Sequence, residues 1–180
     1  MRKIYIILTH TGTVLSKIIK YYTKDEFSHV SIALDNELKE MYSFGRLHPS
    51  NPFFAGFVHE YIHKGTFKRF PKTVANVYSI EVDDNQFNNI KTIIYKMKNN
   101  SKHYKFNIIG LFAVSLHVRI KIKNYFYCAE FVKYLLEESG INTNLPDIIR
   151  PEDFKELPNG KKEYTGRLQD YSVNMTKLTH

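Results

Sequence analysis

The only cysteine of the chain, Cys128, occupies a position suited to nucleophilic chemistry. From Cys128 onward, apolar residues recur at 128, 132, 135 and 136, the spacing of a helix that packs on a core. Gly140 suits the left-handed residue just past the end of such a helix. Cys128 therefore falls in the first helical turn, where unpaired N–H groups and the helix dipole favour a thiolate. Because a lone cysteine is more commonly a small buried hydrophobe, the nucleophile hypothesis requires a histidine within reach.

His29 is the best candidate for that histidine. The stretch from Ser28 to Leu34 alternates strictly, so Val30 and Ile32 face one way while His29 and Ser31 face the other. Residues 35–37 are expected to form a tight turn, and residues 38–44 to return as the second arm of a hairpin. His29 then begins a strand, on a face of small residues that leaves room for another group.

A second group of residues that could do chemistry is the sequence His59-Glu60-Tyr61-Ile62-His63, which has the pattern H-E-x-x-H. On a helix, this spacing puts two imidazoles on one face to hold zinc, with the glutamate as general base. The motif lies in residues 45–71, a stretch interrupted by proline and glycine that we expect to be irregular. It has no evident third ligand. The pattern of His59, Glu60 and His63 nevertheless makes a zinc-dependent hydrolase the alternative enzyme class.

The remaining segments follow simpler periodicities. Strands are predicted at residues 3–8, 74–82, 120–127 and 162–168. Helices are predicted from 13 to about 22, from Asp83 or Asp84 to about 99, within the apolar run 106–118, and from Pro151 as a short helix. The helix that ends near 99 should bury Phe87, Ile90, Ile94 and Met97. The run 106–118 is too short to cross a bilayer.

The composition indicates one globular domain, residues 1–180, with a tail expected to fray from about 172. Hydrophobic residues make up 43% and charged residues 24% of the chain. The formal net charge is +8, but most basic residues are scattered lysines, and no nucleic-acid-binding motif is present, so we expect no specific nucleic-acid partner. One cysteine excludes an internal disulfide, and no signal segment or membrane span is evident, which together favour a cytoplasmic protein.

Three segments together resemble a known family: His29–Asp35, Glu40–Gly45 and Tyr127–Val132. They are similar to the circularly permuted branch of the NlpC-type papain-like superfamily, in particular the YiiX/YaeF-like cysteine hydrolases. Lecithin retinol acyltransferase-like enzymes are more distant relatives with the same His-before-Cys order. The resemblance implies an α+β, permuted papain-like fold in which an antiparallel sheet packs against a Cys-headed helix.

The resemblance also implies a Cys-His-acid triad of Cys128, His29 and Glu40 that works through a thioester acyl-enzyme, without metal or cofactor. Hairpin counting instead places Ser43 opposite His29, so Ser43 is the alternative third member. Tyr127, Ser43 and Tyr42 are candidates for oxyanion or substrate contacts, and residues 45–71 for a wall or lid of the site. The substrate would be an amide or ester in a peptide, a peptidoglycan fragment or a lipid. Acyl transfer in place of hydrolysis, a non-catalytic binding module on the same fold, and the oligomeric state all stay open.

Overall fold

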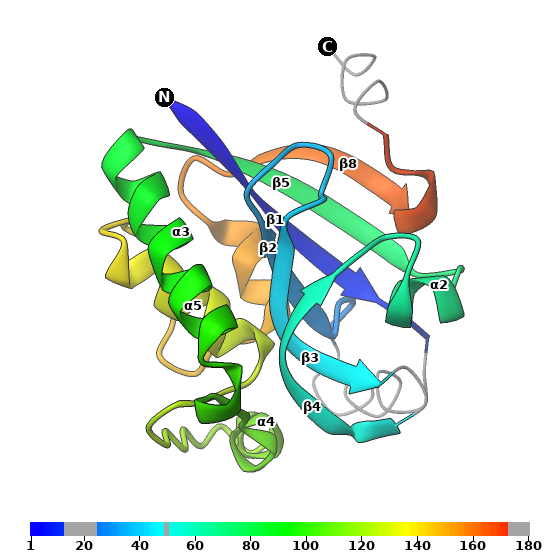
Figure 1. The fold of residues 1–180 in the computed structure, drawn as a ribbon, viewed down its shortest axis with the longest axis vertical. Coiled ribbons are helices and arrows are strands. Elements are labelled where there is room, and N and C mark those ends of the chain that lie inside the picture. Colours follow the sequence, from blue (N-terminus) through cyan, green and yellow to red (C-terminus); the bar gives the residue numbers. More distant parts are fainter. Residues whose placement is uncertain (13–24, 49–50, 173–180) are drawn as a thin grey trace.

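A computed structural model describes residues 1–12, 25–48 and 51–172, and shows a mixed α+β fold built on one eight-stranded sheet (Figure 1). The strand order is β7-β6-β4-β3-β2-β1-β5-β8. Neighbouring strands are antiparallel, except for the short pair β6 and β7, which is parallel. The α+β class expected from the sequence is therefore confirmed.

The elements have the following bounds. The strands are β1 (Arg2–His10), β2 (His29–Ala33), β3 (Met41–His48), β4 (Asn51–Glu60), β5 (Val74–Val82), β6 (Lys105–Phe106), β7 (Tyr125–Phe126) and β8 (Lys161–Arg167). The α-helices are α2 (Gly65–Arg69), α3 (Asp84–Asn99), α4 (Ile108–Ser115) and α5 (Cys128–Glu138). The 3-10 helices are η1 (Ser101–His103), η2 (Pro151–Glu156) and η3 (Leu168–Asp170).

Both faces of the sheet are covered, because successive strand residues point to opposite sides. One face carries Ile6, Ile32 and Phe44 and packs against α3 and α5, forming the larger core. The other face carries Ile7 and Met41 and packs against residues of α2 and of the chain after β8. Figure 1 shows α3 and α5 on one side of the sheet and α2 on the other.

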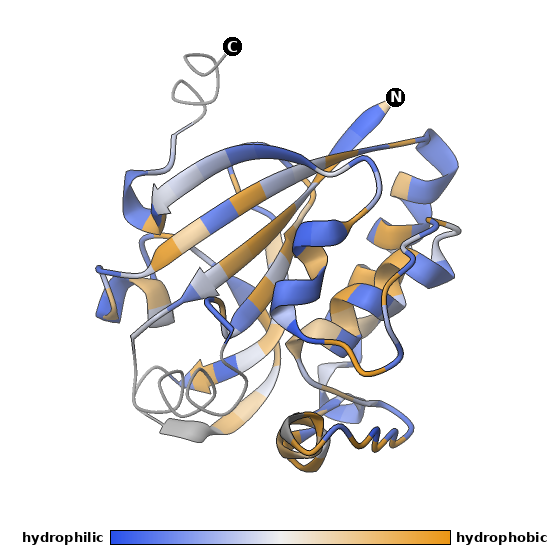
Figure 2. Cartoon of the chain, turned by 180° about the vertical axis from the view of Figure 1, so that it is seen from behind, coloured by the Kyte–Doolittle hydropathy of each residue, from blue (hydrophilic) through white to orange (hydrophobic). Residues whose placement is uncertain are grey.

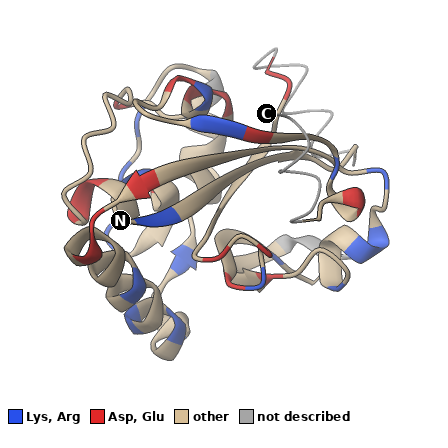
Figure 3. Ribbon diagram, turned by 90° about the horizontal axis from the view of Figure 1, so that it is seen from above, with Lys and Arg blue, Asp and Glu red and all other residues tan. Residues whose placement is uncertain are grey.

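Helix α3 illustrates how local sequence sets an element. The Asp83 side chain accepts a hydrogen bond from the Gln86 backbone N–H at 2.8 Å, and the Gln86 side chain accepts one from Asp83 in return, which is a capping box. The predicted stripe of Phe87, Ile90, Ile94 and Met97 is buried. In Figure 3, α3 is red at its start and blue along its outer side, as expected for a helix with one solvated face.

Several sequence expectations need correction. Residues 45–71 are largely regular, since β3 extends to His48 and β4 runs through Pro52 and Gly56 as far as Glu60. The predicted strand at 120–127 is reduced to the two residues of β7. The second arm of the hairpin begins at Met41 and not at Leu38. The helix predicted from 13 to about 22 lies outside the described residues.

Other expectations are confirmed. The strand predicted at 74–82 matches β5 residue for residue, and those predicted at 3–8 and 162–168 fall on β1 and β8. Cys128 is the first residue of α5, and Gly140 has a φ of +76° just past its end. The core face of α5 buries Phe131, Val132, Leu135 and Leu136 against the same cluster as Ile32 and Phe44. The Cys-headed helix is thus packed on a mostly antiparallel sheet.

Because Ile94 is fully buried on the face of α3 that packs on the core, Ile94→Ala should lower the free energy of unfolding by about 2–5 kcal/mol. Thr92→Ala, two residues earlier on the exposed side, should change it by less than about 0.5 kcal/mol. Urea denaturation with an unchanged m-value measures both. Equal effects of the two substitutions would contradict the assigned core face of α3.

Candidate active site

His29 lies between a carboxylate and the only thiol of the chain. Its Nε2 is 3.0 Å from Oε1 of Glu60, and the Cys128 side chain lies close enough to the ring to raise the pKa of the imidazole. Since Nε2 is directed to the carboxylate, Nδ1 is the nitrogen left for the thiol. Cys128 is 4% exposed, the Glu60 side chain 9% and the His29 side chain 19%. The side chains of Cys128 and His29 are therefore neighbours, and a hydrogen bond between them stays a prediction.

The environment of His29 favours its charged form. Burial by itself would lower the pKa of the imidazole, but the charge of Glu60, its hydrogen bond with the ring and the neighbouring Cys128 outweigh burial. Together they raise the pKa from 6.5 to about 10. His29 is therefore an imidazolium at neutral pH, and it loses its proton only as the pH rises toward 10.

The register of β2 and β3 explains how Glu60 reaches the ring. Ile32 pairs with Tyr42 and Ala33 with Met41, so extending the pairing to the start of β2 brings Gly45 opposite His29. A Cβ at Gly45 would lie only 3.2 Å from His29 Cε1 and 3.4 Å from Glu60 Oε1. The missing side chain on β3 therefore leaves the space in which the carboxylate from β4 meets the imidazole from β2.

Glu60 is held by a second partner on β2. The Ser31 hydroxyl donates to Oε2 of Glu60 at 2.5 Å, while Oε1 contacts His29. Both carboxylate oxygens are thus engaged. The alternation of β2 places Ser31 and His29 on the same face, so a single carboxylate serves both side chains.

The assignment of Glu40 as the partner of His29 is wrong for this structure. Glu40 lies in the loop between β2 and β3, where its carboxylate accepts a 3.3 Å hydrogen bond from the Tyr95 hydroxyl. The loop is longer than the tight turn assumed from the sequence, because the Asp35 carboxylate accepts hydrogen bonds from the backbone N–H groups of residues 37, 39 and 40. Glu40 is consequently removed from the end of the hairpin where His29 lies.

Ser43, the alternative third member, is also excluded from the contact with His29. Its hydroxyl donates to the Val30 carbonyl at 2.7 Å, and the residue is fully buried. The hairpin count that favoured Ser43 assumed a turn over residues 35–37, and the longer loop shifts the register by two residues. The residue that the longer loop brings opposite His29 is Gly45.

The two tyrosines expected at the oxyanion or substrate site have structural contacts. The Tyr127 hydroxyl donates to the Ile149 carbonyl at 2.9 Å, and burial raises the pKa of Tyr127 well above its usual value. Tyr42 is 1% exposed, lies in the core and stacks on Phe57 and His59. Burial is also the main reason that the pKa of Tyr42 rises to about 12. Neither hydroxyl is placed to contact an acyl group at Cys128.

The H-E-x-x-H sequence does not form the helix that a zinc site of this type requires. His59 and Glu60 end strand β4 and point to opposite faces, and exposed His63 lies in the turn before α2. The His59 ring donates to the Lys39 carbonyl at 2.8 Å and accepts from the Tyr61 hydroxyl at 2.9 Å. Within the described ranges, no three His, Cys, Asp or Glu side chains converge as metal ligands would.

A segment after α5, residues 149–155, ties the His29 strand to the Cys128 helix. Arg150 contacts Asp25 at 3.2 Å, the Glu152 carboxylate accepts from the Phe27 N–H at 3.1 Å, and Lys155 pairs with Glu26 at 3.0 Å. The same segment accepts the Tyr127 hydroxyl through Ile149. It therefore holds the residues just before His29 and the residue just before Cys128.

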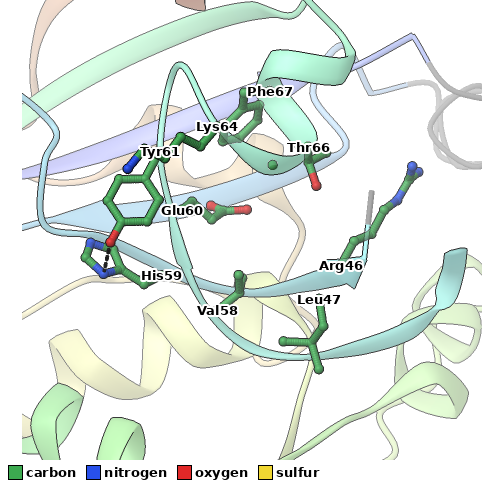
Figure 4. A pocket seen from close by; sticks show the side chains of 10 residues that line it. Arg46, Leu47, Val58, His59, Glu60, Tyr61, Lys64, Thr66 and Phe67 are labelled. Atoms are coloured by element: carbon green, nitrogen blue, oxygen red, sulfur yellow. Dashed lines mark hydrogen bonds between the residues drawn. The ribbon is translucent and has the colours of Figure 1, made fainter. Parts of the chain in front are cut away.

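A pocket of about 140 Å³ adjoins the carboxylate end of this arrangement (Figure 4). Its walls are formed by Arg46 and Leu47 of β3, the last residues of β4, and residues 64–67. Figure 4 shows the Glu60 side chain pointing away from His59 and Tyr61. Neither His29 nor Cys128 lines the pocket, so it lies on the Glu60 side of the imidazole. Residues 45–71 supply Gly45 and Glu60 beside His29, but α2 packs on the face of the sheet opposite α5, so the prediction that this segment forms a wall or lid over Cys128 is wrong.

Glu60 is the functional residue that sequence reasoning failed to assign to His29. Its H-E-x-x-H context suggested zinc chemistry, and Pro52 and Gly56 obscured the strand that carries it. A usable signal was present in Gly45, a residue without a side chain on the strand next to His29. Such a glycine commonly marks a close approach of another group.

Replacing Glu60 should move the titration of His29, whereas replacing Glu40 should not. In Glu60→Gln the raising effect of the carboxylate is lost while burial and the neighbouring Cys128 remain, so the pKa of His29 should fall below about 10. Glu40→Gln is the matched control, since Glu40 contacts Tyr95. NMR titration of the His29 ring measures both. A shift in Glu40→Gln with none in Glu60→Gln would restore the original assignment.

In comparisons with known proteins, no family model matches the chain, and no curated protein matches it at a significant level. The resemblance of the His29 and Cys128 segments to papain-like enzymes is thus not supported by a match over the chain. A function must be argued from the chemistry of His29, Glu60 and Cys128 and from their arrangement.

Proposed function

We propose that the protein is a cysteine hydrolase in which Cys128 is the nucleophile, His29 the acid–base group and Glu60 the residue that orients His29. The single observation that carries this proposal is the position of the His29 ring, which is hydrogen-bonded to a buried carboxylate and neighbours the only thiol of the chain. A nucleophile, a base within hydrogen-bond reach and a third group that orients the base form the general pattern of covalent catalysis.

The ion pair of His29 and Cys128 is the resting state of the proposed enzyme. A protonated imidazole beside the thiol, together with the helix start, stabilises the thiolate. The Glu60 carboxylate fixes the orientation of the ring and supports its positive charge. Ser31 holds Glu60 in turn, so that the carboxylate does not turn away from His29.

The first turn of α5 supplies donors for the developing oxyanion. The first hydrogen bond of the helix runs from the Phe131 N–H to the Tyr127 carbonyl, which leaves the N–H groups of residues 128–130 without acceptors inside the helix. The Cys128 N–H is adjacent to the attacking sulfur. It takes the role of oxyanion donor in place of the Tyr127 hydroxyl, which is directed to Ile149.

The reaction proceeds in two steps. The Cys128 sulfur attacks the acyl carbon of an amide or ester, and the leaving group departs with the proton of His29, which leaves a thioester. His29, now neutral, takes a proton from water, and the resulting hydroxide attacks the thioester and releases the acid. The thioester bond formed in the first step is thus broken in the second, and His29 is again protonated beside the thiolate.

The chain order His29, Glu60, Cys128 fits a permuted papain-like enzyme. Support for this class comes from a helix headed by the cysteine, a mostly antiparallel sheet that carries the histidine, and the three sequence segments quoted above. The third residue departs from the family pattern, since the acid comes from β4 and not from the hairpin that carries His29. The acyl group of the substrate would belong to a peptide, a cell-wall fragment or a lipid.

The activated thiol is directly testable because the chain has a single cysteine. Iodoacetamide should label Cys128 rapidly at pH 7, and intact-protein mass spectrometry reports that residue alone. His29→Gln should slow labelling by about tenfold or more, because an ordinary thiol is only a few per cent thiolate at that pH. The parent rate should persist at pH 6, where the His29 imidazolium is intact.

Two carboxylate variants sharpen this test. Glu60→Gln should slow labelling, but less than His29→Gln does, and Glu40→Gln should label like the parent protein. Cys128→Ser has no thiol and therefore gives the background signal of the labelling assay. A parent rate equal to that of an unperturbed thiol, or a His29→Gln rate equal to the parent rate, would refute the proposed nucleophile.

Gly45→Ala should disturb the pairing of His29 with Glu60, because the added methyl group would meet both side chains at 3.2 to 3.4 Å. We expect slower labelling of Cys128 with little loss of stability. Gly56→Ala is the matched control: its Cβ would meet Leu47, a partly exposed and flexible side chain, at 3.3 Å. Equal labelling rates in the two variants would show that the space at Gly45 has no part in placing His29.

A further inference from the structure

Helix α4 and the segment after it carry a cluster of exposed apolar side chains, which we call the α4 surface. Its members, with their exposed fractions, are Ile108 (38%), Ile109 (59%), Phe112 (50%), Leu116 (75%), Val118 (49%) and Ile122 (37%). Single exposed apolar residues are ordinary, but a cluster of this kind within one segment marks an interaction site. In Figure 2, α4 is seen end-on at the lower edge of the molecule, mostly orange, beside a loop with blue segments.

The composition of α4 is unusual for a helix at a protein surface. Ala113 and Val114 face the core and are buried, while Ile109, Phe112 and Leu116 are exposed at the spacing i, i+3, i+7. The outward side of a surface helix normally carries charged or polar residues. No residue of Ile108–Ser115 is charged. Both sides of α4 are therefore apolar, and the outward side exposes 59% of Ile109 and 75% of Leu116.

Along the sequence, the charged residues on either side of the α4 surface are all basic, although Asp147 and Glu130 approach Arg119 in space. The sequence contains no Asp or Glu between Asp84 and Glu130, and this stretch holds Lys91, Lys96, Lys98, Lys102, Lys105, Arg119, Lys121 and Lys123. Arg119 contacts Asp147, which lies outside the stretch, at 3.0 Å. After α4, apolar and basic residues alternate from Val118 to Lys123, and all of them except the half-buried Ile120 are exposed. The α4 surface is thus flanked by cations.

We propose that the α4 surface binds the interface of an anionic phospholipid bilayer. A bilayer offers an apolar layer for Ile109 and Leu116 and, directly above that layer, anionic headgroups for Lys121 and Lys123. Lysine and arginine can place their stems along the apolar layer and their charges among the headgroups, which suits the alternation after α4. In the described ranges, no helix has the length and apolar character to cross a membrane. Helix α4 has 8 residues, and in the proposed complex it lies in the interface plane with Ile109 and Leu116 toward the apolar layer.

Docking in this way would bring the first turn of α5 close to the membrane. The Asn107 side chain, which caps α4, donates to the Ile120 carbonyl at 2.9 Å and to Glu130 of α5 at 3.3 Å. The α4 surface and the start of the Cys128 helix therefore move as one unit. Binding itself does not require Cys128 chemistry, so the membrane proposal and the hydrolase proposal fail or succeed separately.

The absence of tryptophan from the sequence gives a direct assay. Leu116→Trp puts a single reporter on the α4 surface, and its emission should shift to the blue with vesicles of equal parts phosphatidylcholine and phosphatidylserine. Val74→Trp is the matched control, because Val74 is also exposed (40%) but lies on β5, near the other end of the strand order. Its emission should not change.

Vesicle sedimentation then measures affinity. Ile109→Ser with Leu116→Ser should weaken binding about tenfold or more, and Val74→Ser should leave it unchanged. Lys121→Gln should weaken it about fivefold, the loss expected for one cation near an anionic surface, whereas Lys72→Gln should not. Circular dichroism confirms that each variant is folded.

Three results would overturn the proposal. One is an unchanged emission from Leu116→Trp with anionic vesicles. Another is equal loss of binding in the α4 and β5 variants. The third is a parent protein whose α4 surface is occupied by a second copy of the chain, seen as a dimer in size-exclusion chromatography that Ile109→Ser with Leu116→Ser converts to monomer.

Discussion

The pairing of His29 with Glu60 is the constraint that the rest of the candidate site depends on. A carboxylate and an imidazolium are both largely removed from water, and each is tolerable there only because the other is 3.0 Å away. Removing one partner of a buried pair typically costs about 3–5 kcal/mol, because the other charge is left uncompensated. The pair also crosses three strands, since His29 lies on β2, Gly45 leaves space on β3, and Glu60 comes from β4. The register in which β2, β3 and β4 pair therefore also determines whether His29 and Glu60 meet.

Elements with a strong local period were predictable from the sequence. The buried stripe of α3, the bounds of β5 and the position of Cys128 at the head of α5 follow from periodicity and capping, which depend on neighbours in sequence. The pairing partner of His29 was not predictable in this way. It depends on how many residues the loop after β2 contains, and the Asp35 carboxylate enlarges that loop through three backbone hydrogen bonds.

The candidate site shows the same division. His29 and Cys128 were found because each is the first residue of an element with a clear pattern. The start of such a strand or helix can be identified from neighbouring residues in the sequence. Glu60 ends a strand that contains Pro52 and Gly56, both poor strand formers, and its pairing with the rest of the sheet overrides that local preference. The H-E-x-x-H pattern was misleading for the same reason: a tertiary contact, and not the sequence spacing, decides which way the Glu60 side chain points.

The segment at residues 149–155 has a consequence for when the thiol becomes reactive. Its contacts with Asp25 and Phe27 join residues 125 positions apart in the chain, and contacts of such long range form slowly because a large loop must close first. Until they form, the start of the His29 strand lacks its links to the segment that follows the Cys128 helix. In the proposed hydrolase, Cys128 would therefore gain its reactivity late in folding, when the two ends of the fold have met.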